Sequence, residues 1–160
     1  MHLYLLRHGD AAESSSDDAS RPLTPLGNDQ ALLAARAVKK FNVALDEIWC
    51  SPVLRAKQTA EVVRRELGAK ELVVTEYLVP TSDHRQIISK LNVTSFHAIL
   101  LVGHEPHLST LVSVLMSGNR NSRIVMKKGS LACLEVAKPI EAGIGVLRWL
   151  FSPEEIQRLR

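Results

Sequence analysis

The chain has 160 residues, of which 46% are hydrophobic and 23% are charged, as in ordinary soluble globular domains and unlike disordered chains. Its 20 Lys and Arg against 17 Asp and Glu give a net charge of +3 and a pI of about 9.0, without the block of like charges typical of nucleic-acid binders. Neither a signal-peptide pattern nor a stretch of roughly 18 apolar residues occurs, so we expect a cytoplasmic, monomeric protein with no nucleic-acid or membrane partner.

The first part of the chain predicts a strand, a loop and a helix. Residues 1–6 form a short apolar run, and Gly9 allows a sharp turn behind it. Residues 10–21 are rich in Ser and Asp and predict a loop. Thr24 followed by Pro25 is a typical helix start, an N-cap residue with Pro at the first helical position.

The next elements repeat this alternation. Residues 47–50 predict a strand, and Ser51 with Pro52 resembles the same helix-start pattern, with Arg55 in the first helical turn. The remaining patterns predict a strand at 72–75, a helix from Ser82-Asp83 to 91, a strand at 97–102, a helix at 106–116, two or three strands between 124 and 151, and a short helix after Ser152-Pro153.

This order predicts one domain over residues 1–160 with an α/β fold: three layers, α/β/α, around a central mixed, mostly parallel sheet. The strand at 97–102 is a nearly continuous apolar run, as expected for a strand buried on both faces. Cys50 and Cys133 lie inside apolar runs, which predicts buried free thiols rather than a disulfide or a cysteine nucleophile.

Three predicted strands deliver polar side chains at their carboxyl ends. Arg7 and His8 follow the first strand, Arg55 follows the second, and His104 with Glu105 follows the strand at 97–102. Ligands bind at this edge of open α/β sheets. If the strands are parallel neighbours, two arginines and two histidines meet in a compact cationic pocket suited to a phosphoryl group.

Each of these residues also has a simpler interpretation. Arg55 alone could be a solvated helix residue. His104 and His107 have the spacing of a metal-binding pair, but no third ligand accompanies them, so His107 is expected on the surface at a helix start. His84 and His97 are expected to be ordinary edge or surface residues.

Four blocks together are similar to the histidine phosphatase superfamily, and within it to the SixA-type phosphohistidine phosphatases. They are LRHGDA at 6–11, RPLTPLG at 21–27, SPVLRAKQTA at 51–60 and VGHEPHL at 102–108. They occur in the family's order and span most of the chain. The resemblance implies a phosphoglycerate mutase-like fold and a phosphatase that forms a transient phosphohistidine.

The resemblance also implies roles for individual residues. His8 would be the nucleophile, and Arg7, Arg55 and His104 would hold the phosphoryl oxygens. Gly9 and Arg21 would contribute to substrate binding, although Arg21 could equally pair with an acid of the preceding loop. Because these groups supply the charge, no metal or other cofactor is expected.

The proton donor to the leaving group is less defined. Glu105 stands where some members of the superfamily carry an acidic donor, and it is our prediction. Glu76 lies near where phosphoglycerate mutase-like members place theirs. Asp10 and Asp18 belong to the loop over the pocket and remain alternatives.

The short chain favours phosphohistidine of a partner protein, of the histidine phosphotransfer type, as the substrate, because there is no room for the large inserted caps that enclose small substrates in longer relatives. The alternative is a phosphatase of a small phosphorylated metabolite such as a sugar phosphate. A module that binds phosphorylated ligands without turnover is disfavoured because nucleophile and clamp are all present.

Overall fold

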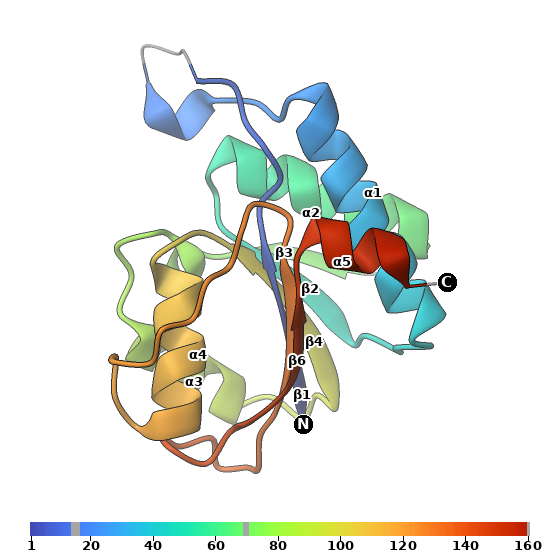
Figure 1. Cartoon of the computed structure of the whole chain (residues 1–160). Coiled ribbons are helices and arrows are strands. Elements are labelled where there is room, and N and C mark those ends of the chain that lie inside the picture. Colours follow the sequence, from blue (N-terminus) through green and yellow to red (C-terminus); the bar gives the residue numbers. More distant parts are fainter. Residues whose placement is uncertain (14–16, 69–70, 160) are drawn as a thin grey trace.

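A mixed sheet between two layers of helices makes up the described part of the protein (Figure 1). The computed structural model describes residues 1–13, 17–68 and 71–159, so part of the predicted loop at 10–21 and the last residue of the predicted domain lie outside the described residues. The strands are β1 (His2–Arg7), β2 (Glu47–Cys50), β3 (Glu71–Val74), β4 (Ala98–Gly103), β5 (Leu131–Glu135) and β6 (Val146–Phe151). The helices are α1 (Pro25–Lys40), α2 (Leu54–Leu67), α3 (His84–Asn92), α4 (His107–Ser117) and α5 (Pro153–Arg158), with short 3₁₀ helices η1 (Asp18–Ser20) and η2 (Glu76–Leu78).

The strand order in the sheet is β3-β2-β4-β1-β5-β6. The first four strands in this order are parallel, and β5 and β6 are antiparallel to their neighbours. Arg7 of β1 pairs with Gly103 of β4, and Cys50 of β2 pairs with Val102. The carboxyl ends of β1, β4 and β2 therefore lie side by side, as the site prediction required.

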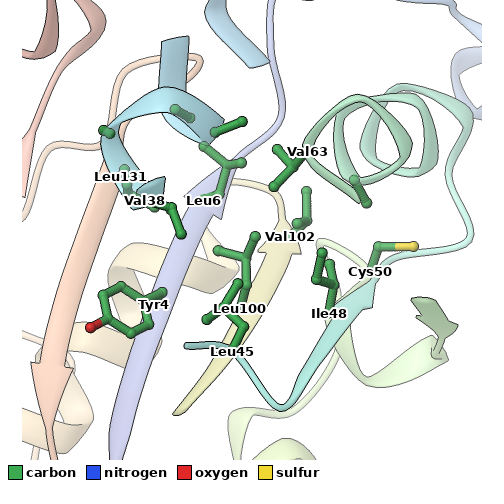
Figure 2. Packing of buried hydrophobic residues seen from close by; sticks show 14 of the residues in the cluster. Tyr4, Leu6, Val38, Leu45, Ile48, Cys50, Val63, Leu100, Val102 and Leu131 are labelled. Atoms are coloured by element: carbon green, nitrogen blue, oxygen red, sulfur yellow. The ribbon is translucent and has the colours of Figure 1, made fainter. Parts of the chain in front are cut away.

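Both faces of the sheet are covered, which confirms the three-layer prediction. In β1, Tyr4 and Leu6 pack with α1, α2 and α5, whereas Leu3 and Leu5 pack with α3 and α4. Figure 2 shows the first of these cores, in which Leu6 of β1 lies between Val38 of α1 and Val63 of α2. A strand buried on both faces needs apolar residues at every position, which explains the continuous apolar run of β4.

The two predicted helix starts have different outcomes. Thr24 caps α1 by accepting a hydrogen bond from the Gly27 N–H, with Pro25 in the first turn, as predicted. The prediction at Ser51 is wrong, because α2 begins at Leu54 and its N-cap has no side-chain hydrogen bond. The Ser51 N–H instead bonds the Val102 carbonyl at 3.0 Å, so the strand pairing continues through it.

The tail between 124 and 151 contains two strands among the described residues, and neither begins at 124. The backbone ahead of β5 bonds the end of β1 instead: the Gly129 N–H donates to the Arg7 carbonyl at 3.1 Å. Gly129 has φ +75°, a conformation that favours glycine and turns this segment into β5. No helix in the described ranges is long and apolar enough to cross a membrane.

Candidate active site

His8 lies immediately after β1 and is 5% exposed. Its Nδ1 is 2.7 Å from the Gly9 carbonyl oxygen, which can only accept, so Nδ1 carries the proton and Nε2 carries the ring's basic lone pair. The Arg55 Nε–H donates to Nε2 at 3.2 Å. Burial lowers the pKa of His8 to about 4, so the ring is neutral near pH 7 and Nε2 is a competent nucleophile.

Arg55 stands in the first turn of α2 and is buried, which excludes the solvated-helix interpretation. Thr59, one helical turn further on, links Arg55 to the loop that carries His8. The Thr59 hydroxyl accepts from the Gly9 N–H at 3.1 Å and donates to the Arg55 carbonyl at 2.8 Å. Thr59 lies in the block at 51–60, but no role was predicted for it from the sequence; its spacing of four from Arg55 was the available signal.

His104 follows β4, and its ring centroid lies 5.0 Å from that of His8. It is 1% exposed, and neither ring nitrogen has a hydrogen-bond partner in the described ranges. Burial lowers the pKa of His104 to about 3, so it offers one neutral N–H donor and one acceptor. The sequence suggested a cationic pocket made by arginines and histidines together; with both rings neutral, the positive charge comes from the arginines.

Arg7, the last residue of β1, is held by the segment ahead of β5. Its Nη1 donates to the Met126 carbonyl at 2.7 Å, and its backbone N–H donates to the Ser130 carbonyl at 3.0 Å. Burial lowers the pKa of Arg7, while the carboxylate of Glu105 acts in the opposite direction. The part played by Met126 was missed, since a carbonyl leaves no mark in a sequence.

Gly9 has a steric role in the site. Its N–H bonds Thr59 and its carbonyl accepts from His8, so neither backbone group faces a ligand. A Cβ on Gly9 would collide with the backbone of Gly27, and a Cβ on Gly27 would collide with the backbone of Asp10. The two glycines thus let the first turn of α1 pack directly against the loop that carries His8.

Arg21 pairs with an acid of the preceding loop, one of the two predicted alternatives. Its Nη2 lies 2.7 Å from Oδ1 of Asp18. The other carboxylate oxygen of Asp18 lies 3.1 Å from Nη2 of Arg55, and the Asp18 carbonyl accepts from Arg55 Nη1 at 2.8 Å. Asp18 therefore connects Arg21 to Arg55, which contacts His8.

Two of the four candidate proton donors are held as carboxylates. Hydrogen bonds from Lys128 at 2.7 Å and Thr24 at 2.8 Å lower the pKa of Asp10. The hydrogen bond from Arg55 lowers the pKa of Asp18. An acid stabilised in its ionised form is a poor proton donor near neutral pH, which disfavours both.

The two glutamates are placed differently. Glu105 is half-buried, and its Oε1 accepts from the Ser109 N–H at 3.0 Å in the first turn of α4. Glu76 is exposed in η2, between β3 and α3. Neither side chain has a hydrogen bond to His8 or His104 in the described ranges, so their role in proton transfer stays a prediction.

The predictions for the other histidines are partly wrong. His97 is exposed as expected, but His107 is 3% exposed and His84 is also buried. Both stand at the first position of a helix, and α3 and α4 pack on the same face of the sheet, so their first turns face the protein interior. Burial lowers the pKa of His107 to about 4.

Metal ligands and cysteine thiols are the other groups that could carry chemistry in this protein. Among residues 1–13, 17–68 and 71–159, no group of three or more His, Cys, Asp or Glu side chains is arranged to hold a metal ion. Cys50 and Cys133 are buried free thiols, as predicted. Burial raises the pKa of the Cys50 thiol to about 11, so it is protonated near neutral pH and is no nucleophile.

Comparison with known proteins identifies the class to which this fold and site belong. Residues 3–79 match the histidine phosphatase superfamily (branch 1), a region that includes Arg7, His8, Arg21 and Arg55. The chain belongs to this superfamily, as its four sequence blocks indicated.

Its relatives within the superfamily include SixA proteins. The chain is 31% identical to the phosphohistidine phosphatase SixA of Escherichia coli K12 over 96% of its own length and 94% of that protein. It matches the solved structure of the protein histidine phosphatase SixA complexed with tungstate with a TM-score of 0.87, 29% identity and coverage of 96% and 97% of the two chains. A putative alpha-ribazole-5'-P phosphatase from Escherichia coli shares the fold, with a TM-score of 0.78 at 20% identity over 96% and 97% of the two chains.

Proposed function

We propose that this protein is a phosphatase in which Nε2 of His8 attacks phosphorus and becomes transiently phosphorylated. The observation that carries the proposal is the state of His8: a neutral ring, with Nδ1 bonded to the Gly9 carbonyl and Nε2 beside Arg55. Such a nitrogen has both the lone pair and the orientation that a nucleophile needs. Arg7, Arg55 and His104 surround it with donors for the phosphoryl oxygens.

The reaction has two steps. In the first, the bond from phosphorus to Nε2 forms while the bond from phosphorus to the leaving group breaks. In the second, water attacks phosphorus, inorganic phosphate is released and His8 returns to its neutral form. The arginines neutralise the charge on the three equatorial oxygens throughout, so we propose that the reaction is independent of metal ions.

We propose Glu105 as the donor of the proton that the leaving group takes up. It is half-buried next to His104 in the chain, and its charge acts on Arg7. Its carboxylate is not paired with a cation in the described ranges, unlike those of Asp10 and Asp18. Substrates with a poor leaving group need this proton most.

For the substrate, we propose phosphohistidine in a partner protein. Support comes from the similarity to SixA over nearly the full length of both chains, which leaves no large inserted cap in this chain relative to that protein. One chain supplies every proposed group, so a monomer suffices. The two free thiols suit a reducing compartment such as the cytoplasm.

A small phosphorylated metabolite is the second candidate. The observation in its favour is that His8 is only 5% exposed, since a small phosphate ester reaches a recessed nucleophile more easily than a protein side chain does. The two candidates share the same His8 chemistry and differ in what surrounds the phosphoryl group.

The deciding experiment compares kcat/KM for a phosphohistidine-bearing phosphotransfer protein with kcat/KM for a panel of sugar phosphates and other phosphate monoesters. We expect the phosphoprotein to be preferred by a factor of roughly 10² or more, because this ratio reports differential binding of the transition state. His8→Ala is the control for contaminating phosphatases, and a chelator should leave the rates unchanged. A metabolite that outperforms the phosphoprotein would establish the second candidate instead.

A further inference from the structure

An acid of the protein itself occupies two arginines of the site, Arg21 and Arg55. The Asp18 carboxylate has Oδ1 2.7 Å from Arg21 Nη2 and Oδ2 3.1 Å from Arg55 Nη2. The Asp18 carbonyl accepts a hydrogen bond from Arg55 Nη1 at 2.8 Å, and Nε2 of His8 accepts one from Arg55 Nε at 3.2 Å. All three nitrogens of Arg55 are thus engaged, two of them by Asp18.

This arrangement resembles what a phosphoryl group would present to the same residues. A carboxylate and a phosphoryl group both offer anionic oxygens to the planar fork of an arginine. The Arg55 Nε–H donates to the lone pair of His8 Nε2, so this hydrogen bond must break when phosphorus bonds to Nε2, and the Arg55 guanidinium is then next to the oxygens of the phosphoryl group. A substrate that binds Nη1 and Nη2 of Arg55 must take them from Asp18.

We propose that Asp18 is an internal anion that the phosphoryl group displaces, and that Arg21, freed by the same exchange, becomes a further phosphoryl ligand. The inference rests on the proposed function. It gives Arg21 two successive partners, first the carboxylate and then the substrate, and it makes Asp18 a determinant of how strongly an anion must bind to enter the site.

The exposure of Asp18 makes the exchange feasible. Its side chain is 70% exposed, whereas that of Arg55 is 6% exposed. The Asp18 carboxylate is already largely hydrated, so its own release to water has a small cost, while the buried Arg55 guanidinium exchanges one anionic partner for another and is not left unpaired. A dianionic phosphoryl group, with more charge and three oxygens, competes well against a single carboxylate. A monoanion carries less charge than a phosphoryl dianion and therefore competes less well with the Asp18 carboxylate for the arginines.

Asp18 is tethered to the site, so it competes at a high effective concentration. Removing its charge should therefore tighten anion binding without any new contact. We expect Asp18→Asn to bind tungstate roughly threefold to tenfold more tightly than the wild type, as measured by calorimetry on the full chain. Asp29→Asn is the matched control, because it removes the same charge from an exposed site on α1 and should leave the affinity unchanged.

Arg21 supplies the second arm of the experiment. If Arg21 becomes a ligand of the anion, Arg21→Gln weakens tungstate binding, and the loss persists when Asp18→Asn is also present. If Arg21 serves only to hold Asp18 in place, Arg21→Gln would release Arg55 and tighten the binding. That result would overturn the role given to Arg21.

Tungstate binding and phosphate ester hydrolysis together distinguish a failure of the Asp18 exchange from a failure of the phosphatase assignment. If the wild type hydrolyses an aryl phosphate and binds tungstate, but Asp18→Asn binds it equally or more weakly, Asp18 is a positioning residue for Arg55 and the exchange is wrong. If neither the wild type nor Asp18→Asn binds tungstate, and no phosphate ester is hydrolysed, both the exchange and the phosphatase assignment are wrong.

Discussion

Two pairs of buried histidines can be compared in this protein. His8 and His104 follow β1 and β4, and His84 and His107 begin α3 and α4. An arginine contacts one ring in each pair: Arg55 Nε lies 3.2 Å from His8 Nε2, and a guanidinium nitrogen of Arg120 lies 3.4 Å from His84 Nδ1. Burial lowers the pKa in all four rings, so burial and an arginine do not by themselves distinguish a catalytic pair.

The surroundings of the two pairs differ in ways that matter for chemistry. The Gly9 carbonyl fixes the tautomer of His8, whereas Nδ1 of His84 faces Arg120 and, at 3.7 Å, an oxygen of Asp83. Asp83 also caps α3 and pairs with Arg85, so it is part of the helix and not easily exchanged. A buried histidine thus becomes a candidate nucleophile where a hydrogen bond sets its tautomer and where the neighbouring arginines can exchange their present partners for a ligand.

Replacing one histidine of each pair tests the difference between the two pairs most directly. His8→Ala should lower kcat/KM for an aryl phosphate by about 10³-fold or more, because it removes the nucleophile, while His84→Gln should change it less than about threefold. Trapping labelled phosphate on the wild type should give an acid-labile adduct that is missing in His8→Ala. An acid-stable adduct, or equal activities of the two variants, would contradict the assignment.

The arginines give the next largest effect. Arg55→Gln should lower kcat for aryl phosphate hydrolysis by roughly 10²- to 10³-fold, as expected when a preorganised donor to the reacting oxygens is lost. Arg120→Gln removes the corresponding arginine from the other pair and should leave kcat within about twofold. Circular dichroism melts verify that both variants fold. A comparable loss in both would mean that Arg55 acts through stability and not through the phosphoryl group.

The sequence predicted which residues form the site better than it predicted the contacts that hold those residues in place. Strand periodicity and the residues following each strand were sufficient to place Arg7, His8 and His104 at one edge of the sheet, because a parallel register brings such ends together. The support from Met126 and the pairing of Asp18 with Arg55 depend on contacts between residues 119 and 37 positions apart. Local patterns carry no information on these contacts.

The same limit explains the wrong predictions. Ser51 has the right residue type for a helix cap, but its backbone continues the pairing with β4, so α2 begins three residues later and the Ser51 hydroxyl accepts from the Val53 N–H ahead of the helix. His107 has a polar side chain at a helix start, and only the packing of α3 and α4 on one face of the sheet shows that it is buried. In both cases tertiary structure overrides a correct local signal.

The acid that donates a proton to the leaving group is the next feature to test. Glu105→Gln should slow hydrolysis of an alkyl phosphate roughly 10- to 100-fold, because the alkoxide needs a proton, and slow phosphohistidine hydrolysis less than about threefold. Glu76→Gln is the matched comparison, since it removes the other candidate carboxylate. If Glu76→Gln gives the larger selective loss, the proton donor is Glu76, and equal losses on both substrates would leave Glu105 without this role.

The smallest effect concerns stability and uses His107, from the pair to which we assign no catalytic role. Burial lowers the pKa of His107 from 6.5 to about 4, so between these pH values the unfolded chain binds a proton that the folded chain does not. Stability is therefore full above about pH 6.5 and is lost as the pH falls toward 4. Between pH 7 and pH 5 the loss from His107 should be about 2 kcal/mol, at 1.4 kcal/mol per pKa unit.

Urea unfolding of His107→Gln and of the wild type at pH 7 and pH 5 measures this loss. His107→Gln should lose less stability between the two pH values than the wild type, even if it is less stable at pH 7. His97→Gln, which removes an exposed histidine, should lose as much as the wild type. If His107→Gln keeps the full pH dependence, His107 is not buried in neutral form. If His107→Gln reduces the pH dependence of stability and retains activity, a buried neutral histidine is not enough for catalysis. The contacts of His8 with Gly9 and Arg55 then distinguish it from His107.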